Sequence, residues 1–313
     1  MPNWTANDIP NLKGTIAVVT GANSGIGFSA ALELARKEAT VWMACRDPKR
    51  AEAAIALIRI QVPNADVVFG QLDLSDLSSV KAFSKQVHAT AKKIDILINN
   101  AGIMAIPERK TTKDGFEMQM GVNHFGHFAL TGLLMPLLLK SQSPRIVNVS
   151  SSAHKFGAKY DFDNFDYSKG GYGAWRAYGN SKLANLLFSQ SLQKHIDDKG
   201  LNIIVTSCHP GYTATNLQYS GPEAKKGTFY GRVVEWANWI FGQSELMGSL
   251  PTLYAAISKD VVKNGFYGPN GWFESRGYPK KVEGSKLSKD EEMAKKLWAY
   301  SEDKTGVTFD FKK

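Results

Sequence analysis

The sequence predicts a single α/β domain in which a doubly wound parallel sheet is covered by helices on both faces. Short apolar, β-branched runs alternate with segments in which apolar residues recur at helical spacing, as in βαβ units. The runs are apolar on both faces, which is typical of buried parallel strands. The chain has 313 residues, of which 43% are hydrophobic and 21% charged, so it can fill one large core.

The predicted elements alternate regularly along the chain. Strands are expected at residues 15–20, 40–45, 67–72, 94–99, 145–150 and 202–208. Helices are expected at residues 28–37, 51–61, 77–91, 121–139 and 178–195. No linker rich in Pro, Gly or Ser divides the pattern and no internal repeat occurs, so residues 1–313 are expected to form one domain.

Two aromatic-rich stretches interrupt this alternation. Residues 156–175 resemble an insertion, residues 219–247 are expected to form a substrate lid, and residues 280–313 form a C-terminal extension. Open α/β sheets bind ligands outside the carboxyl ends of their strands, where such loops gather. We therefore expect the first two stretches to wall the substrate site. Residues 229–241 are also amphipathic enough for a membrane surface, which stays an alternative.

Charge and hydropathy predict the partners and the compartment. The chain carries 38 Lys and Arg against 29 acids, a formal net charge of +9. Basic and acidic residues are mixed along the chain, and their mixture in residues 286–296 predicts a solvated helix face. Because no nucleic-acid-binding motif is present either, a nucleic-acid partner is not expected. The absence of a long apolar run and of a signal-peptide pattern predicts a cytoplasmic protein without a transmembrane segment. Cys45 and Cys208 are expected to be reduced core thiols.

Residues 20–27 (TGANSGIG), here called the glycine loop, join the first predicted strand to the first predicted helix. Backbone N–H groups and the positive end of a helix can face a pyrophosphate there, and glycines allow close approach. The GxxxGxG spacing alone also occurs in ordinary turns. Its place between strand and helix predicts a dinucleotide site formed by Gly21, Asn23, Ser24, Gly25, Ile26 and Gly27.

The end of the second predicted strand indicates which dinucleotide binds. In such folds an acid about 20 residues after the glycines binds the ribose of NAD, whereas an arginine accommodates the 2′-phosphate of NADP. Cys45 stands where the acid would be expected, and Arg46 follows it. We therefore expect NADP(H) to be preferred over NAD(H). The alternatives are that Arg46 pairs with Asp47, or that Asp47 turns toward a ribose.

Tyr178 and Lys182 are spaced to lie on one face of a predicted helix. A phenol has a pKa near 10, and a nearby ammonium stabilises the phenolate and lowers that pKa. Such pairs are also common on exposed helix faces. Together with the glycine loop, an Asn-Asn-Ala-Gly turn at residues 99–102 and serines after the fifth strand, this pair predicts acid–base catalysis.

These motifs, with Asn123 and Pro210-Gly211, occur in the order found in the classical short-chain dehydrogenase/reductase family, which the chain resembles over nearly its whole length. The resemblance implies a Rossmann fold. Residues 44–47 (ACRD), 147–154 (VNVSSSAH) and 181–185 (SKLAN) resemble the retinol-dehydrogenase-like branch, which includes the light-dependent protochlorophyllide reductases.

The resemblance implies a catalytic tetrad of Asn123, Ser151, Tyr178 and Lys182. Ser151 would bond the substrate oxygen, and Tyr178 would donate its proton as hydride leaves the nicotinamide. Lys182 would lower the pKa of Tyr178 and hold the nicotinamide ribose, and Asn123 would order a water that connects Lys182 to solvent. The neighbouring hydroxyls, Ser150 and Ser152, would be strand-end hydrogen bonders.

The resemblance also assigns further contacts to the cofactor. Asp73 and Leu74 would flank the adenine; the alternative for Asp73 is a place at a helix start with its capping residues. The adenosine ribose would pack on Asn100, Ala101 and Gly102. The carboxamide and pyrophosphate would be held by the segment that contains Pro210, Gly211, Thr213 and Thr215.

Some features depart from the family pattern. The spacing between Ser151 and Tyr178 is long, and this insertion could obstruct helix pairing, so a monomer or homodimer is expected. Protochlorophyllide reductases carry a cysteine after the Pro-Gly, where this chain has Tyr212. His124 and His127 lack a third ligand, so no metal is expected.

The sequence therefore predicts an NADP(H)-dependent oxidoreductase that interconverts a small-molecule carbonyl and its alcohol. The aromatic residues near the predicted lid favour a bulky, apolar, retinal-like substrate. The alternatives are a catalytically weak NADPH-sensing protein and an enzyme like the light-dependent protochlorophyllide reductases. The sensor would need the glycine loop but not Tyr178 and Lys182 together.

Overall fold

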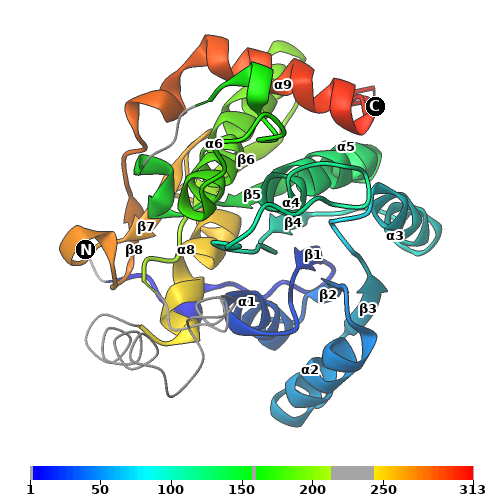
Figure 1. Ribbon diagram of the computed structural model, residues 1–313. Coiled ribbons are helices and arrows are strands. Elements are labelled where there is room, and N and C mark those ends of the chain that lie inside the picture. The colour runs from blue at the N-terminus through cyan, green and yellow to red at the C-terminus, as the bar shows by residue number, and fades with distance from the viewer. Residues whose placement is uncertain (1–2, 157–159, 213–242, 313) are drawn as a thin grey trace, which may run out of the picture.

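One eight-stranded sheet runs through the molecule in the order β3-β2-β1-β4-β5-β6-β7-β8 (Figure 1). The computed structural model describes residues 3–156, 160–212 and 243–312. All neighbouring strands are parallel except β7 and β8. The strands are β1 (Ile16–Thr20), β2 (Thr40–Cys45), β3 (Val67–Gln71), β4 (Ile96–Asn99), β5 (Arg145–Val149), β6 (Ile204–Cys208), β7 (Phe266–Pro269) and β8 (Pro279–Lys281).

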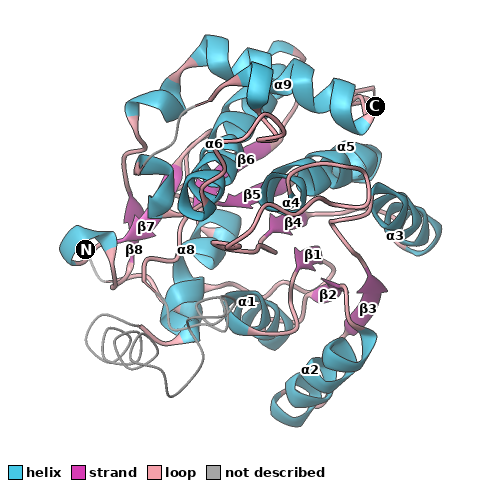
Figure 2. Ribbon diagram, viewed as in Figure 1, coloured by secondary structure: helices cyan, strands magenta, loops and turns pink. Residues whose placement is uncertain are grey.

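Helices cover both faces of this sheet (Figure 2), which confirms the predicted fold class. One apolar core lies between the sheet and helices α1, α2 and α8, and the other lies between the sheet and α3, α5 and α6. The helices are α1 (Gly25–Arg36), α2 (Pro48–Gln61), α3 (Leu77–Thr90), α4 (Met118–Met120), α5 (Gly126–Leu138), α6 (Ala174–Asp198), α8 (Glu245–Ile257) and α9 (Glu291–Thr305).

Several helices begin earlier than apolar periodicity indicates, because polar caps and favourable first residues extend them. The side chain of Asp47 accepts the Arg50 N–H, and Pro48 occupies the first turn, so α2 starts three residues before the predicted position. The predicted helix at 121–139 is continuous, but it combines π-helical and α-helical hydrogen bonding. A π-helical turn (Gly121–Phe125) separates α4 from α5.

The strand order reverses between β1 and β4. The chain runs outward from β1 through β2 to β3 and then returns to place β4 on the other side of β1. The loops after β1 and β4 therefore leave the sheet in different directions and open a crevice at its carboxyl edge. This crevice contains the glycine loop and the turn at residues 99–102.

The C-terminal extension is part of the core rather than an appendage. Most charged side chains of residues 286–296 are exposed, as predicted, but they lie on two elements, a 3-10 turn (Lys286–Lys289) and α9, which Asp290 caps. The same helix α9 buries Ala294 and Leu297. Trp298 and Phe309 pack on Phe128 of α5 at ring-centroid distances of 5.1 and 5.0 Å. None of the described helices is long and apolar enough to cross a membrane.

The described part of the insertion, residues 156 and 160–175, packs against this extension. Phe162 and Phe165 stack with centroids 5.4 Å apart, and Phe165 lies 4.9 Å from Tyr300 of α9. The aromatic residues that marked the stretch in the sequence thus form a small core of their own with Phe125.

Candidate active site

The glycine loop forms a tight turn into α1. Gly21 and Gly25 have φ values of +65° and +60°, in the left-handed region that favours glycine. A Cβ on Gly27 would overlap the carbonyl oxygen of Gly21 and lie 2.5 Å from Nδ2 of Asn100. The glycines therefore keep the backbone open at the N-terminus of α1, where phosphate groups bind favourably.

A cavity of about 330 Å³, here called the catalytic cavity, unites most of the predicted site residues. Three segments that are distant in sequence meet there: the glycine loop, the turn after β4, and α6. The lining residues are Gly21, Asn23, Ser24, Ile26, Gly27, Asn100, Ala101, Gly102, Ile103, Val149, Ser150, Tyr178, Lys182 and Pro210. Ile103 and Val149 were not singled out in the sequence, because no motif marks an apolar wall residue.

Tyr178 is buried on α6, and its hydroxyl is hydrogen-bonded to the side chain of Ser151. Burial raises the pKa of Tyr178 above its ordinary value, and the bond to Ser151 offsets this only in part. In the protein without its cofactor the net shift of the Tyr178 pKa is therefore upward, opposite to the direction expected from Lys182. Nζ of Lys182 lies 5.8 Å from the centroid of the Tyr178 ring, and desolvation of the phenol dominates.

Lys182 is buried beneath the cavity. Its Nζ donates to the carbonyl oxygen of Val149 at 3.1 Å, and the side chain of Asn185 donates to the same oxygen at 3.0 Å. Burial lowers the pKa of Lys182 to about 8. The ammonium therefore persists at neutral pH but is lost in mildly alkaline solution.

Three consecutive serines follow β5, and the structure gives each a different partner. Oγ of Ser150 donates to the carbonyl oxygen of Lys182 at 2.7 Å. Ser152 contacts Nδ1 of His209 at 3.4 Å. Ser151 is the hydroxyl that lies beside Tyr178, and it also accepts the Ala153 N–H at 3.2 Å.

Asn123 lies in the π-helical turn, and its amide braces two elements. Its Oδ1 accepts the N–H of Ile103 at 2.8 Å. Its Nδ2 donates to the carbonyl of Ile103 at 2.9 Å and to Oγ of Ser181 at 2.8 Å. Both amide hydrogens are thus used by protein groups, so the side chain fixes the loop after β4 against α6.

The residues expected to select the cofactor lie at the end of β2. Arg46 is exposed, whereas the buried thiol of Cys45 receives hydrogen bonds from the backbone N–H groups of Ala22 and Asn23. Burial raises the pKa of Cys45 to about 11, so it stays a neutral thiol. Asp47 caps α2 and forms an ion pair with Nε of Arg50 at 3.8 Å, rather than the alternative pair with Arg46.

The residues expected to flank the adenine lie outside the catalytic cavity. Oδ1 of Asp73 accepts the N–H and hydroxyl of Ser75 at 2.9 and 2.6 Å. The cap of α3 is Asp76 rather than Asp73. Leu74 is buried against α5, where a Cβ on Gly126 would lie 2.6 Å from the Leu74 carbonyl oxygen.

The end of β6 leads into the last predicted cofactor segment. Pro210 lines the cavity, and Gly211 has a φ of +68°, which places it against the backbone of Ser275. Thr213, Thr215 and most of the predicted lid at 219–247 lie outside the described residues. The described end of that stretch contains Gln243 and the first turn of α8.

Trp175 ends the stretch 156–175 that the sequence predicts to wall the substrate site, and it lies beside Tyr178. Trp175 is 57% exposed, and its ring meets the ring of Tyr178 edge-on with centroids 6.1 Å apart. The backbone beside it is anchored, because Gln119 donates both to the Ala174 carbonyl and to the Tyr172 hydroxyl. The i, i+3 spacing of Trp175 and Tyr178 on α6 brings the two side chains together.

Among the described residues, no three or more His, Cys, Asp or Glu side chains are grouped so that they could hold a metal ion. His124 bonds Ser301 of α9 at 2.8 Å, and His127 bonds Thr20 at 2.9 Å. His209, which carried no pattern in the sequence, bonds Glu274 at 3.1 Å.

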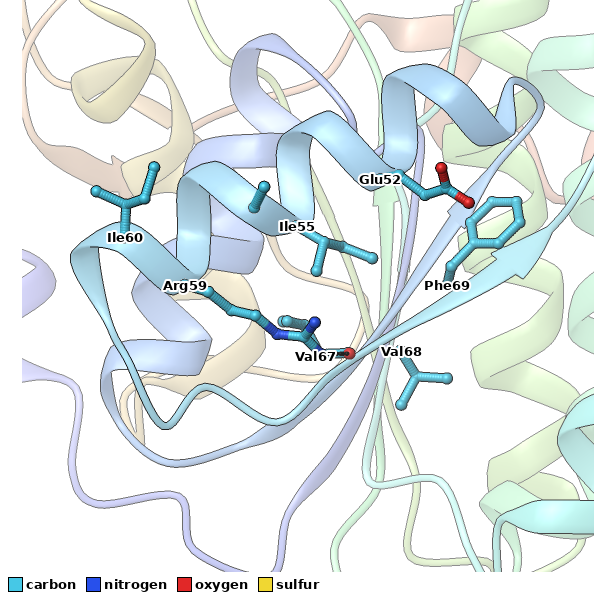
Figure 3. Close-up of a pocket in the computed structure, with 8 residues that line it drawn as sticks. Glu52, Ile55, Arg59, Ile60, Val67, Val68 and Phe69 are labelled. Carbon is cyan, nitrogen blue, oxygen red and sulfur yellow. Dashed lines mark hydrogen bonds between the residues drawn. The ribbon is translucent and has the colours of Figure 1, made fainter.

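A second cavity, of about 710 Å³, lies between α2 and the edge strand β3 (Figure 3). Arg59 ties the helix to the strand by donating to the carbonyl oxygen of Val67 at 3.3 Å. The groove shares no residue with the catalytic cavity, and is lined by Glu52, Ile55, Ala56, Arg59, Ile60, Val67, Val68 and Phe69.

A sequence model described as short chain dehydrogenase matches residues 15–226. The chain belongs to this family of oxidoreductases, whose members use nicotinamide cofactors. Within the family it resembles retinol dehydrogenases. It is 38% identical to human retinol dehydrogenase 13 over 93% of this chain and 84% of that protein. It is 37% identical to human retinol dehydrogenase 11 over 96% of this chain and 88% of that protein.

Solved structures agree with this assignment. An uncharacterized protein from Mycobacterium paratuberculosis superimposes with a TM-score of 0.81 at 39% identity, covering 99% of this chain and 100% of that chain. A short chain dehydrogenase from Shigella flexneri, complexed with NADP, gives a TM-score of 0.56 at 25% identity, covering 75% of this chain and 94% of that chain.

The catalytic cavity fits a dinucleotide at both of its ends. At one end, Gly27 leaves the space that a side chain would fill. At the other, a Cβ on Gly102 would lie 3.3 Å from both Oδ1 of Asn123 and Nζ of Lys182. Glycine at these two positions keeps side chains out of a cavity that both the glycine loop and Tyr178 line.

Proposed function

We propose that this chain is an NADP(H)-dependent oxidoreductase that interconverts a bulky, apolar aldehyde or ketone, such as retinal, and the corresponding alcohol. The catalytic cavity carries the proposal, because it joins Tyr178 and Lys182 to the glycine loop. A protein that only senses a dinucleotide requires the loop but has no use for a buried phenol bonded to a serine.

The nicotinamide, when bound, supplies or accepts the hydride. Tyr178 donates its hydroxyl proton to the substrate oxygen during reduction and recovers it during oxidation. Ser151 donates a hydrogen bond to the same oxygen and stabilises the negative charge that develops there. Lys182 stabilises the Tyr178 phenolate, and Val149 holds the lysine in place. Asn123 keeps the loop after β4 in register with α6.

The preference for NADP(H) is supported by the side chains at the end of β2. Arg46 presents an exposed guanidinium there, and arginine matches phosphate geometry well. Asp47, the acid next to Arg46, has another partner because it caps α2, and Asp73 after β3 bonds Ser75. Cys45, which replaces the expected acid, is a neutral thiol against the glycine loop.

The preference for a bulky apolar substrate is supported by the retinol dehydrogenases that the chain resembles and by the exposed ring of Trp175. This ring lies beside Tyr178 on the first turn of α6. A planar apolar substrate can stack on it while its carbonyl reaches the phenol.

A monomer or homodimer, rather than a larger assembly built on α5 and α6, is part of the proposal. Trp298 and Phe309 already cover Phe128 of α5 and Phe188 of α6. Light scattering coupled to size exclusion measures the assembly directly. A tetramer that persists at low protein concentration would contradict this part.

The first test follows the oxidation of NADPH and NADH with retinal, long-chain aldehydes, aryl ketones and quinones. Tyr178→Phe is expected to lower kcat by about 10² to 10⁴, because it removes the proton donor. Tyr254→Phe, on the opposite core, is the matched control and should keep wild-type rates. Full activity of Tyr178→Phe would overturn the mechanism, and tight NADPH binding without turnover would favour a sensing protein.

The second test addresses cofactor choice. Arg46→Ala is expected to raise KM for NADPH by at least about tenfold and to leave KM for NADH unchanged, because only NADPH loses a charge-assisted bond. Arg50→Ala, which removes a neighbouring exposed charge, should change neither value by more than about twofold. Equal effects of Arg46→Ala on both cofactors would refute the assignment.

A further inference from the structure

The hydroxyl of Thr20, at the end of β1, joins two segments of the cofactor site. Its oxygen accepts the N–H of Asn100 and the N–H of Ala101, each at 2.9 Å. A hydroxyl has two acceptor positions and one hydrogen, so both acceptor positions are occupied. The hydrogen is left for Nε2 of His127, 2.9 Å away, or for the carbonyl of Ile98 at the longer distance of 3.4 Å.

The imidazole of His127 is buried in α5 and can satisfy this arrangement in only one form. Nδ1 lies 3.0 Å from the carbonyl oxygen of Asn123, which can only accept, so Nδ1 carries the hydrogen. Nε2 is then the acceptor for the Thr20 hydroxyl. Both ends of the ring require the same neutral tautomer. Burial, assisted by the charge of Lys182, lowers the pKa of His127 to about 4, which keeps the ring neutral.

His127 therefore connects the two halves of the site. On one side it holds Thr20, and through Thr20 the turn at residues 99–102. On the other side it holds the backbone of Asn123, whose side chain bonds Ile103 and Ser181. Ser181 directly precedes Lys182 on α6.

We propose that His127 is a positioning residue that fixes the cofactor floor, made by Thr20 and residues 99–102, relative to Asn123 and the catalytic face of α6. The inference rests on the proposed function, because it assigns these segments to the cofactor and to the chemistry. His127 itself touches neither, and it acts through Thr20 and Asn123.

Two substitutions separate the two connections. His127→Asn keeps an N–H near the position of Nδ1 and removes the acceptor for Thr20. His127→Gln keeps an oxygen near the position of Nε2 and removes the donor to Asn123. His124→Gln is the matched control, because His124 is equally buried in the adjoining π-helical turn but bonds Ser301 of α9.

The two variants are expected to fail in different ways. His127→Asn raises the dissociation constant of NADPH by about tenfold and leaves kcat at saturating NADPH within about twofold, since the cofactor floor alone is loosened. His127→Gln lowers kcat by about tenfold and leaves NADPH affinity within about threefold, since the Asn123 side alone is loosened. His124→Gln lowers the Tm and leaves both quantities unchanged.

The proposal is overturned if the two His127 variants resemble His124→Gln, or if both change kcat and NADPH affinity in the same proportion. A second measurement needs no variant. Nitrogen NMR of histidine-labelled wild-type protein should show His127 protonated at Nδ1 and unprotonated at Nε2 at neutral pH, and the opposite tautomer would refute the hydrogen-bond assignment. NADPH binding and the tautomer of His127 are both measured without turnover. If no carbonyl compound in the panel is reduced, the proposed function fails, but these two measurements still test the role of His127.

Discussion

Replacing Gly27 by alanine tests the glycine loop with one added methyl group. The new Cβ would overlap the Gly21 carbonyl oxygen and lie 2.5 Å from Nδ2 of Asn100, which donates to the Thr20 carbonyl at 2.8 Å. Overpacking of this kind costs about 1–3 kcal/mol, and loss of the hydrogen bond costs about 1 kcal/mol more. Together these costs, about 2–4 kcal/mol, should lower the free energy of unfolding unless the loop backbone shifts to relieve them. A shifted loop no longer aims its N–H groups at the phosphates, so NADPH affinity should fall by at least about tenfold.

The assay is a titration of NADPH followed by energy transfer from tryptophan to the bound cofactor, with the Tm measured in parallel. Gly200→Ala is the control. Gly200 has a φ of +63° and no heavy atom within 4 Å of its Cβ position. That variant should lose about 1–2 kcal/mol of stability through backbone strain but keep wild-type NADPH affinity. Wild-type affinity in a folded Gly27→Ala protein would refute the assignment of this loop to the cofactor.

Three further results are expected. The kcat/KM for carbonyl reduction should fall above about pH 8, because Lys182, with its pKa lowered to about 8, loses its charge there. Arginine keeps its charge at this pH, so Lys182→Arg should abolish the alkaline fall in kcat/KM. If an active arginine variant still shows that fall, Lys182 is not its source. Trp175→Ala should raise KM for retinal by about 2–10-fold and leave KM for a short aldehyde unchanged. If the two KM values rise by the same factor, stacking of the substrate on Trp175 is ruled out. Phe128→Ala should lower the free energy of unfolding in urea by about 3–5 kcal/mol, against about 0.5 kcal/mol or less for the exposed Phe273→Ala; a small loss at Phe128 would contradict its role in the core.

The parallel sheet and its helices could be predicted from the sequence because their signals are local. Strands such as β2 and β5 are continuous apolar runs, and helices such as α3 bury residues at helical spacing. The ends of these elements were less certain, because they depend on caps such as Asp47. The packing of the extension at 280–313 could not be predicted, since the burial of Leu297 depends on a partner surface more than one hundred residues away in sequence.

The sequence by itself determined which chemical groups this protein has available. The glycine loop, Tyr178 and Lys182 follow from short motifs whose spacing along one element fixes their geometry. Only the tertiary structure decided how distant groups combine. It placed Ser151, rather than Ser150 or Ser152, beside Tyr178. It reversed the expected pKa shift of Tyr178, because desolvation depends on what surrounds the phenol and not on the residue four positions away. It also gave His127 two partners on different elements, since hydrogen bonds across a core arise only when the elements pack together.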